Sequence, residues 1–131
     1  MKNILRTMLA VGVLTLSACA SAPSREDIAN ADYGREITQS ECEQIVKNSA
    51  RTFLKDPSSA EYDFGQCYKS WVANPPILGG GANFGYLMQA NINAKNSFGG
   101  YTGATNYKFL IKNGIIIKHS SCIIHRIHFK K

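Results

Sequence analysis

A regular alternation of apolar and other residues over positions 84–95 is the feature that most limits how this chain can fold. The apolar set is Phe84, Tyr86, Met88, Ala90, Ile92 and Ala94, and the residues between them include Leu87, Gln89, Asn91, Asn93 and Lys95. Side chains on a β-strand point alternately to the two faces of its sheet, so this period predicts a strand with one buried face. Such a strand needs paired neighbours and a cover for its apolar side.

Two further stretches repeat the alternation. Over 61–72 apolar and aromatic residues alternate with residues that are mostly charged. The first set is Tyr62, Phe64, Tyr68 and Val72, and the second is Glu61, Asp63, Cys67 and Lys69. Gly65 would mark a bulge in that strand. After a turn at 96–100 the period resumes with Tyr101, Thr105, Tyr107, Phe109 and Ile111. Two prolines and three glycines make 73–81 an irregular loop.

Asn113-Gly114 is a strong local signal for a two-residue hairpin turn. It joins the strand at 101–111 to one at 115–118, and a final strand is expected at 123–129. A hairpin of this length pairs Lys118 with Phe109 on the buried face, unless a bulge changes the register.

One helix is expected before the strands. Thr38 and Glu41 have the spacing of a capping box, and Ser40 with Glu43 offers a second register. Asp56-Pro57 ends the helix, because the residue before a proline is driven out of the helical region. Three- and four-residue spacing gives the expected helix one mostly apolar face. Its residues are Cys42, Ile45, Val46, Ser49, Phe53 and Leu54. The order predicts an α+β fold, with one N-terminal helix packed on an antiparallel sheet of about five strands.

The start of the chain has the layout of an export signal. Lys2 and Arg6 precede an apolar run at 8–16, which is far shorter than the roughly 20 residues that cross a bilayer. The segment Leu16-Ser17-Ala18-Cys19 then resembles the lipobox of bacterial lipoproteins. The alternatives are an ordinary secretory signal cut near 18–20 and an N-terminal helix of a cytosolic protein.

The lipoprotein resemblance implies cleavage before Cys19, acylation of its thiol and of its new amino group, and a membrane anchor. Ala20 follows, where an aspartate would favour the inner membrane in that family, so the outer membrane is implied, with the domain facing the periplasm or the cell surface. We expect a signal peptide at 1–18, a flexible tether of small and charged residues at 19–37, and a single domain at 38–131.

Two segments of the expected domain carry a second resemblance. Asp56-Pro57-Ser58-Ser59-Ala60 is followed farther along by Asn93-Ala94-Lys95-Asn96-Ser97-Phe98-Gly99-Gly100-Tyr101. Together they are similar to a pattern in small, mostly uncharacterised bacterial envelope proteins. The resemblance implies an envelope domain and brings no established activity.

Charge is divided unevenly along the chain. All nine acidic residues lie at or before Asp63, and the basic residues after it are Lys69, Lys95, Lys108, Lys112, Lys118, Arg126, Lys130 and Lys131. This predicts a basic sheet that attracts an anionic surface, such as lipopolysaccharide, anionic lipid or peptidoglycan. The alternative is a set of solvated lysines on outer strand faces. An envelope location excludes nucleic acid as a partner.

Three cysteines remain once Cys19 is assigned to the lipid, so one disulfide and one spare thiol are expected in an oxidising compartment. Three pairings are possible. Strand parity places Cys67 and Cys122 on the sheet face away from the helix, whereas Cys42 lies on the apolar face of the helix. We therefore predict a disulfide between Cys67 and Cys122, provided that the first and last strands are neighbours, with Cys42 free.

Catalytic and metal-binding patterns are weak in this chain. His119, Cys122, His125 and His128 are spaced by three, but a strand turns them to opposite faces, so no metal site is predicted. The segment Gly79–Gly81 lacks the lysine and hydroxyl residue of a phosphate loop. No G-x-S-x-G motif is present. We predict no enzymatic activity and no cofactor.

The turn between the central strands is the candidate binding site. An aromatic side chain at its tip, flanked by amides, suits contact with a protein or a carbohydrate. The alternative is a tight turn whose polar side chains bond only its own backbone. The residues are Lys95, Asn96, Ser97, Phe98, Gly99, Gly100 and Tyr101. The predicted function is a non-catalytic interaction or structural module of the envelope; the alternative is an inhibitor-like or glycan- or anion-binding surface lipoprotein.

Overall fold

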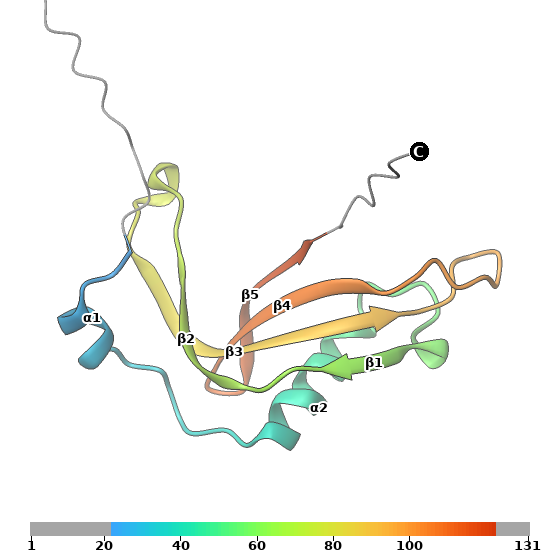
Figure 1. Ribbon diagram of the computed structural model, residues 1–131, viewed down its shortest axis with the longest axis horizontal. Helices are drawn as coiled ribbons and strands as arrows, with labels where there is room; N and C mark the ends of the chain where they lie inside the picture. The colour runs from blue at the N-terminus through green and yellow to red at the C-terminus, as the bar shows by residue number, and fades with distance from the viewer. Residues whose placement is uncertain (1–21, 123–131) are drawn as a thin grey trace, which may run out of the picture.

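The computed structural model describes residues 22–122 and contains one antiparallel sheet of five strands (Figure 1). The elements are α1 (Arg25–Ala29), α2 (Gln39–Ala50), β1 (Glu61–Phe64), β2 (Tyr68–Ala73), β3 (Ala82–Asn93), β4 (Thr105–Lys112) and β5 (Ile115–Cys122). Two short 3₁₀ turns, η1 (Pro57–Ser59) and η2 (Pro76–Leu78), lie between them. The prediction of an α+β fold with an antiparallel sheet is confirmed, with a second short helix added at the N-terminal side.

The strand with the clearest alternation, β3, is the centre of the sheet. β4 pairs along one edge of β3, from Tyr86 opposite Ile111 to Ile92 opposite Thr105. The other edge of β3 is shared, because β1 pairs with its C-terminal part and β2 with its N-terminal part. The single strand predicted over 61–72 is therefore two strands, separated at 65–67.

The main core lies between α2 and one face of β3 and β4. Met88 and Ile92 of β3 and Phe109 of β4 are buried there beneath Cys42 and Val46 of α2. Because strand side chains alternate, the same period that buries these residues turns the intervening ones to the other face. The predicted packing of a helix on the sheet is confirmed for α2.

The predicted capping box begins α2. The Thr38 hydroxyl accepts a hydrogen bond from the Glu41 backbone (3.2 Å), and the Glu41 carboxylate accepts one from the Thr38 backbone (3.0 Å). The helix ends at Ala50, earlier than the predicted stop at Asp56. The amides of Phe53 and Leu54 both donate to the Ala50 carbonyl, which closes the helix in a turn.

The β4–β5 hairpin has the predicted turn. Asn113 and Gly114 both have positive φ, at 53° and 79°, as a type I′ turn requires. The register shifts between Leu110 and Ile111, so Lys118 lies opposite Leu110 and not opposite Phe109. This bulge keeps the lysine away from the helix-covered core. The strand predicted at 123–129 lies outside the described residues.

The segment expected to be a flexible tether is packed on the domain over its described part, 22–37. Ser24 and Asp27 cap α1 reciprocally. Residues 31–37, here called the strap, run from α1 toward the start of α2 (Figure 1). The Tyr33 ring meets Phe84 of β3 edge-on at 5.7 Å, and Ile37 is buried in the core. Most residues of this segment are small or polar. Contacts of the two apolar side chains nevertheless hold it on the domain.

Polar contacts tie the strap to the β4–β5 turn. Asp32 forms an ion pair with Lys112 (3.0 Å), and the Arg35 amide donates to the Asn113 side-chain oxygen (2.9 Å). Gly34 lies against this turn with φ 80°, and a Cβ there would be 2.6 Å from the same oxygen. The tether prediction is therefore wrong for 22–37.

Candidate functional site

The disulfide joins Cys42 to Cys67, with Cα atoms 6.4 Å apart. The predicted bridge between Cys67 and Cys122, with Cys42 free, is wrong. The reason is the break at 65–67, where the chain leaves β1 and re-enters the sheet as β2 in a new phase. Cys67 lies in that break and packs against the core beneath α2. Parity arguments hold only within one continuous strand.

A side-chain amide holds this break against the start of α2. Gln39 accepts a hydrogen bond from the Cys67 backbone (2.9 Å) and donates one to the Gly65 carbonyl (3.1 Å). The alternation then restarts, so Tyr68 and Val72 lie on the sheet face opposite to the one that α2 covers. The sequence signal for this rearrangement is only Gly65, which predicted a bulge and not a break.

The candidate binding turn at 95–101 is closed by its own asparagine. The Asn96 side-chain oxygen accepts hydrogen bonds from the backbones of Phe98 (2.9 Å) and Gly100 (3.1 Å). The backbone amide of Asn96 donates to the Gly100 carbonyl (2.9 Å), and Lys95 pairs with Tyr101 as an isolated β-bridge. Asn96 therefore bonds its own turn, as the alternative prediction held. Phe98 at the tip is 96% exposed.

Ser59 of η1 supports the turn from behind. Its hydroxyl accepts a hydrogen bond from the Lys95 backbone (2.9 Å), and its carbonyl accepts one from the Tyr101 hydroxyl (3.0 Å). The Lys95 ammonium lies 5.5 Å from the centre of the Tyr101 ring. The two separated sequence segments, 56–60 and 93–101, thus contact each other, and these contacts fix the turn.

A small hollow adjoins the turn on the helix-covered side. It has a volume of about 170 Å³ and is bounded by residues from the segment after α2, from β3, from β4 and from the candidate turn and its surroundings. They include Phe53, Lys55, Lys95, Thr102 and Tyr107. The rings of Phe53 and Tyr107 lie 5.2 Å apart. The sequence pattern did not predict this hollow, because a helix that continued to Asp56 would place Phe53 on its core face, whereas α2 ends at Ala50.

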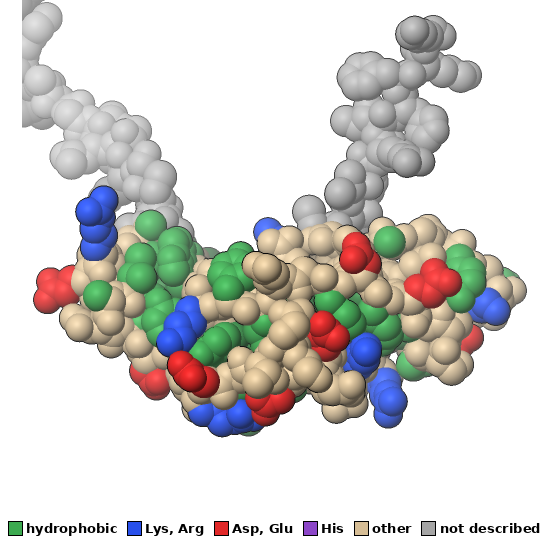
Figure 2. All heavy atoms as spheres, turned by 60° about the horizontal axis from the view of Figure 1, so that its bottom comes forward, with side chains coloured by type: hydrophobic (Ala, Val, Ile, Leu, Met, Phe, Trp, Pro, Cys, Tyr) green, Lys and Arg blue, Asp and Glu red, His purple; other side chains and the backbone are tan. Residues whose placement is uncertain are grey.

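The basic residues of the second half of the chain meet acidic residues of the first. Besides the Asp32–Lys112 pair, Lys69 lies 3.9 Å from Glu36 and its ammonium is 5.9 Å from the Tyr33 ring. Figure 2 shows acidic and basic side chains interspersed over the face that it brings forward. Lys108 remains exposed, and Lys118 bonds Asn74. Three basic residues of the predicted set, Arg126, Lys130 and Lys131, lie outside the described residues.

Hydrogen bonds lower the pKa of four carboxyl groups below their ordinary values. Hydrogen bonds from Ser24 lower the pKa of Asp27, and the Gly34 amide with Lys112 lowers that of Asp32. The Thr38 amide lowers the pKa of Glu41, and the Ser58 hydroxyl lowers that of Asp56. These four groups are therefore ionised at neutral pH and act as acceptors and charge partners.

Metal-ligating residues do not gather within 22–122, where no group of three His, Cys, Asp or Glu side chains could hold an ion. His119 lies parallel to the Phe53 ring, with centroids 6.2 Å apart. His125 and His128 lie outside the described residues.

The proposed lipid-bearing Cys19 and the leader before it also lie outside the described residues. No helix within 22–122 is long and apolar enough to cross a membrane. Comparisons with protein-family models, curated proteins and solved structures find no match to this chain.

Proposed function

We propose that this protein is an outer-membrane-anchored lipoprotein whose domain is a non-catalytic interaction module of the cell envelope, with the turn at 95–101 as its contact surface. The exposure of Phe98 supports this most directly. Covering a water-exposed phenyl ring with a partner removes apolar surface from water, which favours binding. Because Asn96 and Ser59 already fix the backbone beneath it, little conformational entropy is lost on binding.

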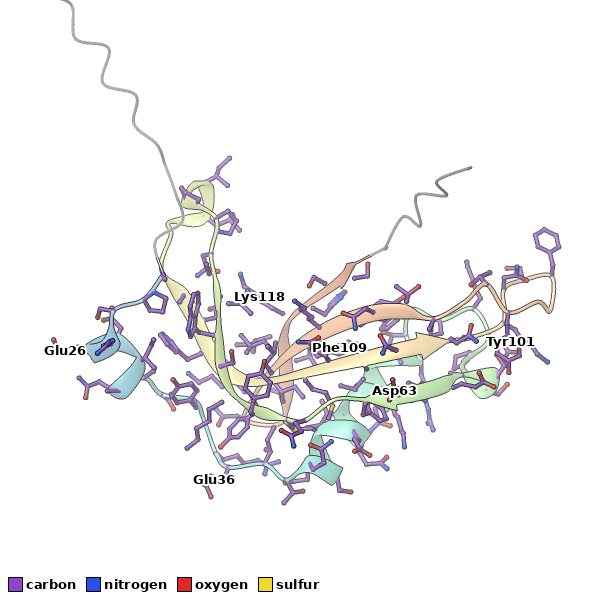
Figure 3. The ribbon with its side chains drawn as sticks, in the orientation of Figure 1. Glu26, Glu36, Asp63, Tyr101, Phe109 and Lys118 are labelled. Carbon is purple, nitrogen blue, oxygen red and sulfur yellow. A yellow bond between two sulfur atoms is a disulfide. The ribbon has the colours of Figure 1, made fainter. Side chains whose placement is uncertain are left out.

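The place of the turn in the molecule suits this role. β3 runs from Ala82, close to Ala22, to Asn93, which leads into the turn. Measured along the strand, its 12 residues have a length of roughly 36 Å at about 3.3 Å per residue. Figure 3 shows Tyr101 of the turn and Glu26 of α1 at opposite ends of the molecule. An anchor at Cys19 would hold the α1 end at the membrane and present the turn to a partner.

The hollow beside the turn supports glycan or anion binding as a second candidate function. It combines the aromatic rings of Phe53 and Tyr107 with the cations of Lys55 and Lys95. Aromatic faces pack on sugar rings while polar groups bond the hydroxyls or acidic groups. This ligand would occupy the hollow and leave Phe98 exposed, so the two functions make different predictions for the same variant.

Lipidation is tested by metabolic labelling in cells. Labelled palmitate is expected to enter the wild-type protein and not Cys19→Ser, because the cysteine thiol is the acceptor in the lipoprotein reaction. Ser59→Ala, which leaves the leader unchanged, is the control and should be labelled like the wild type. Equal labelling of Cys19→Ser would overturn the lipid anchor.

Contact through the turn is tested by placing a photo-crosslinking side chain at Phe98 in intact cells. We expect one envelope protein to be joined to this position and not to Tyr68, an exposed aromatic residue on β2. Phe98→Ala should weaken binding to that protein roughly 30-fold, the effect of losing an aromatic hot spot of about 2 kcal/mol. Unchanged affinity in Phe98→Ala, with loss of glycan binding in Phe53→Ala, would favour the second function.

A further inference from the structure

The loop between β2 and β3, residues 74–81, exposes two large aliphatic side chains. Ile77 is 90% exposed and Leu78 is 71% exposed, both in η2 at the tip of the hairpin. No charged residue occurs from 73 to 82. Exposing these two side chains to water is unfavourable compared with burying them. A loop that only connects two strands does not need such a pair at its tip.

The backbone of this loop satisfies several of its own hydrogen bonds. The Asn74 amide donates to the Gly81 carbonyl (2.9 Å), and the Leu78 amide donates to the Pro75 carbonyl (2.9 Å). Pro75 and Pro76 have no amide hydrogen to satisfy. Fewer bare donors must therefore lose water when the tip leaves the aqueous phase.

The loop lies beside the end of the chain that leads to the proposed lipid anchor. Ala22 and Pro23 line the same surface hollow, of about 430 Å³, as Gly81 and Ala82. Figure 1 shows the β2–β3 hairpin tip rising from the sheet on the side where the described N-terminal segment begins. Cys19 is three residues before Ala22, a reach of at most about 11 Å.

We propose that Ile77 and Leu78 insert into the interfacial layer of the membrane that holds the Cys19 acyl chains. The inference rests on the lipid anchor of the proposed function and adds a second point of contact. Apolar side chains enter roughly 5–10 Å into that layer, which an uncharged tip does without burying a charge. Two contacts near one end of the domain fix its orientation and direct the turn at 95–101 away from the membrane.

A tryptophan at the loop tip reports this insertion. The mature lipidated protein carrying Trp71→Phe, which removes the chain's single tryptophan, is reconstituted in phosphatidylethanolamine and phosphatidylglycerol vesicles with brominated acyl chains. The indole of Ile77→Trp is expected to shift to shorter wavelength and to lose most of its fluorescence. Phe98→Trp in the same background is the matched control, because it is equally exposed at the far end of β3, and should remain unquenched.

A second pair of variants tests the apolar side chains themselves. Adding Leu78→Asp to Ile77→Trp should abolish the quenching, since a carboxylate does not enter the apolar layer. Adding Tyr68→Asp, on an exposed β2 position outside the loop, should leave the quenching unchanged. If Trp71→Phe fails to fold, the same comparison is made with Trp71 retained and its own emission subtracted.

Flotation of the vesicles separates this inference from the anchor on which it rests. Protein that does not float with the vesicles overturns the lipid anchor and the insertion together. Protein that floats, with equal quenching or none at positions 77 and 98, overturns the insertion and leaves the anchor standing. Quenching at 77 that persists in Leu78→Asp also overturns it, because the apolar tip would then not be what enters the lipid.

Discussion

Replacing Cys42 and Cys67 with alanine is expected to lower the free energy of unfolding by roughly 3.5 kcal/mol, from the chain-entropy model for a loop of this length. The two residues are 25 positions apart and join the first turns of α2 to the break between β1 and β2. For a domain of about 100 residues this corresponds to a fall of roughly 15–25 °C in Tm. Thermal unfolding followed by circular dichroism measures it.

A reductant provides the control for this prediction. It should lower the Tm of the wild-type protein by a similar amount and leave the double variant unchanged. Peptide mapping without reduction should recover the Cys42 and Cys67 peptides joined. A wild-type Tm that ignores the reductant, or a peptide that joins Cys67 to Cys122, would show that the pairing is different.

Phe109→Ala is expected to lower the free energy of unfolding by about 3–5 kcal/mol, the range for removing a buried phenyl ring. Phe109 is 0% exposed and pairs with Met88 across β3 and β4. Its ring also lies 6.0 Å from that of Tyr107. The variant loses this burial and leaves a cavity beneath α2. Urea unfolding of both proteins gives the difference.

The same chemical change at the candidate turn is the matched control. Phe98→Ala should alter the free energy of unfolding by less than about 0.5 kcal/mol, because Phe98 is exposed and none of the described residues covers its ring. Similar losses at the two positions would mean that Phe98 belongs to a core, and would remove the basis for a contact surface there. A small loss at Phe109 would place the core elsewhere in the sheet.

Features that depend on a few neighbouring residues were predictable from the sequence. The capping box joins residues three positions apart, and the Asn113-Gly114 turn needs positive φ at two adjacent residues. The strand at 84–95 follows from a period of two within one continuous segment, and β3 confirms it at 82–93. In each case the physical cause lies inside the window in which the pattern is read.

The disulfide and the strap were not predictable in this way. One break at 65–67 reverses the phase of every later residue in the strand, and no local pattern separates a break from a bulge. The strap is held by Tyr33, Ile37 and contacts with Asn113, which is 78 positions from its partner Arg35. Composition averages over such widely spaced anchors, so it predicted a tether.

Some properties of the candidate turn follow from its local sequence, and others follow only from tertiary packing. By itself the sequence determined that a turn forms at 96–100, because its asparagine and glycines favour that backbone locally. Only the tertiary structure decided that Ser59 supports it and that Phe98 stands uncovered. It also decided that the loop carrying Ile77 and Leu78 adjoins the N-terminal segment through Gly81, at the opposite end of β3. Exposure and proximity depend on how the elements pack, and packing joins residues that no local pattern relates.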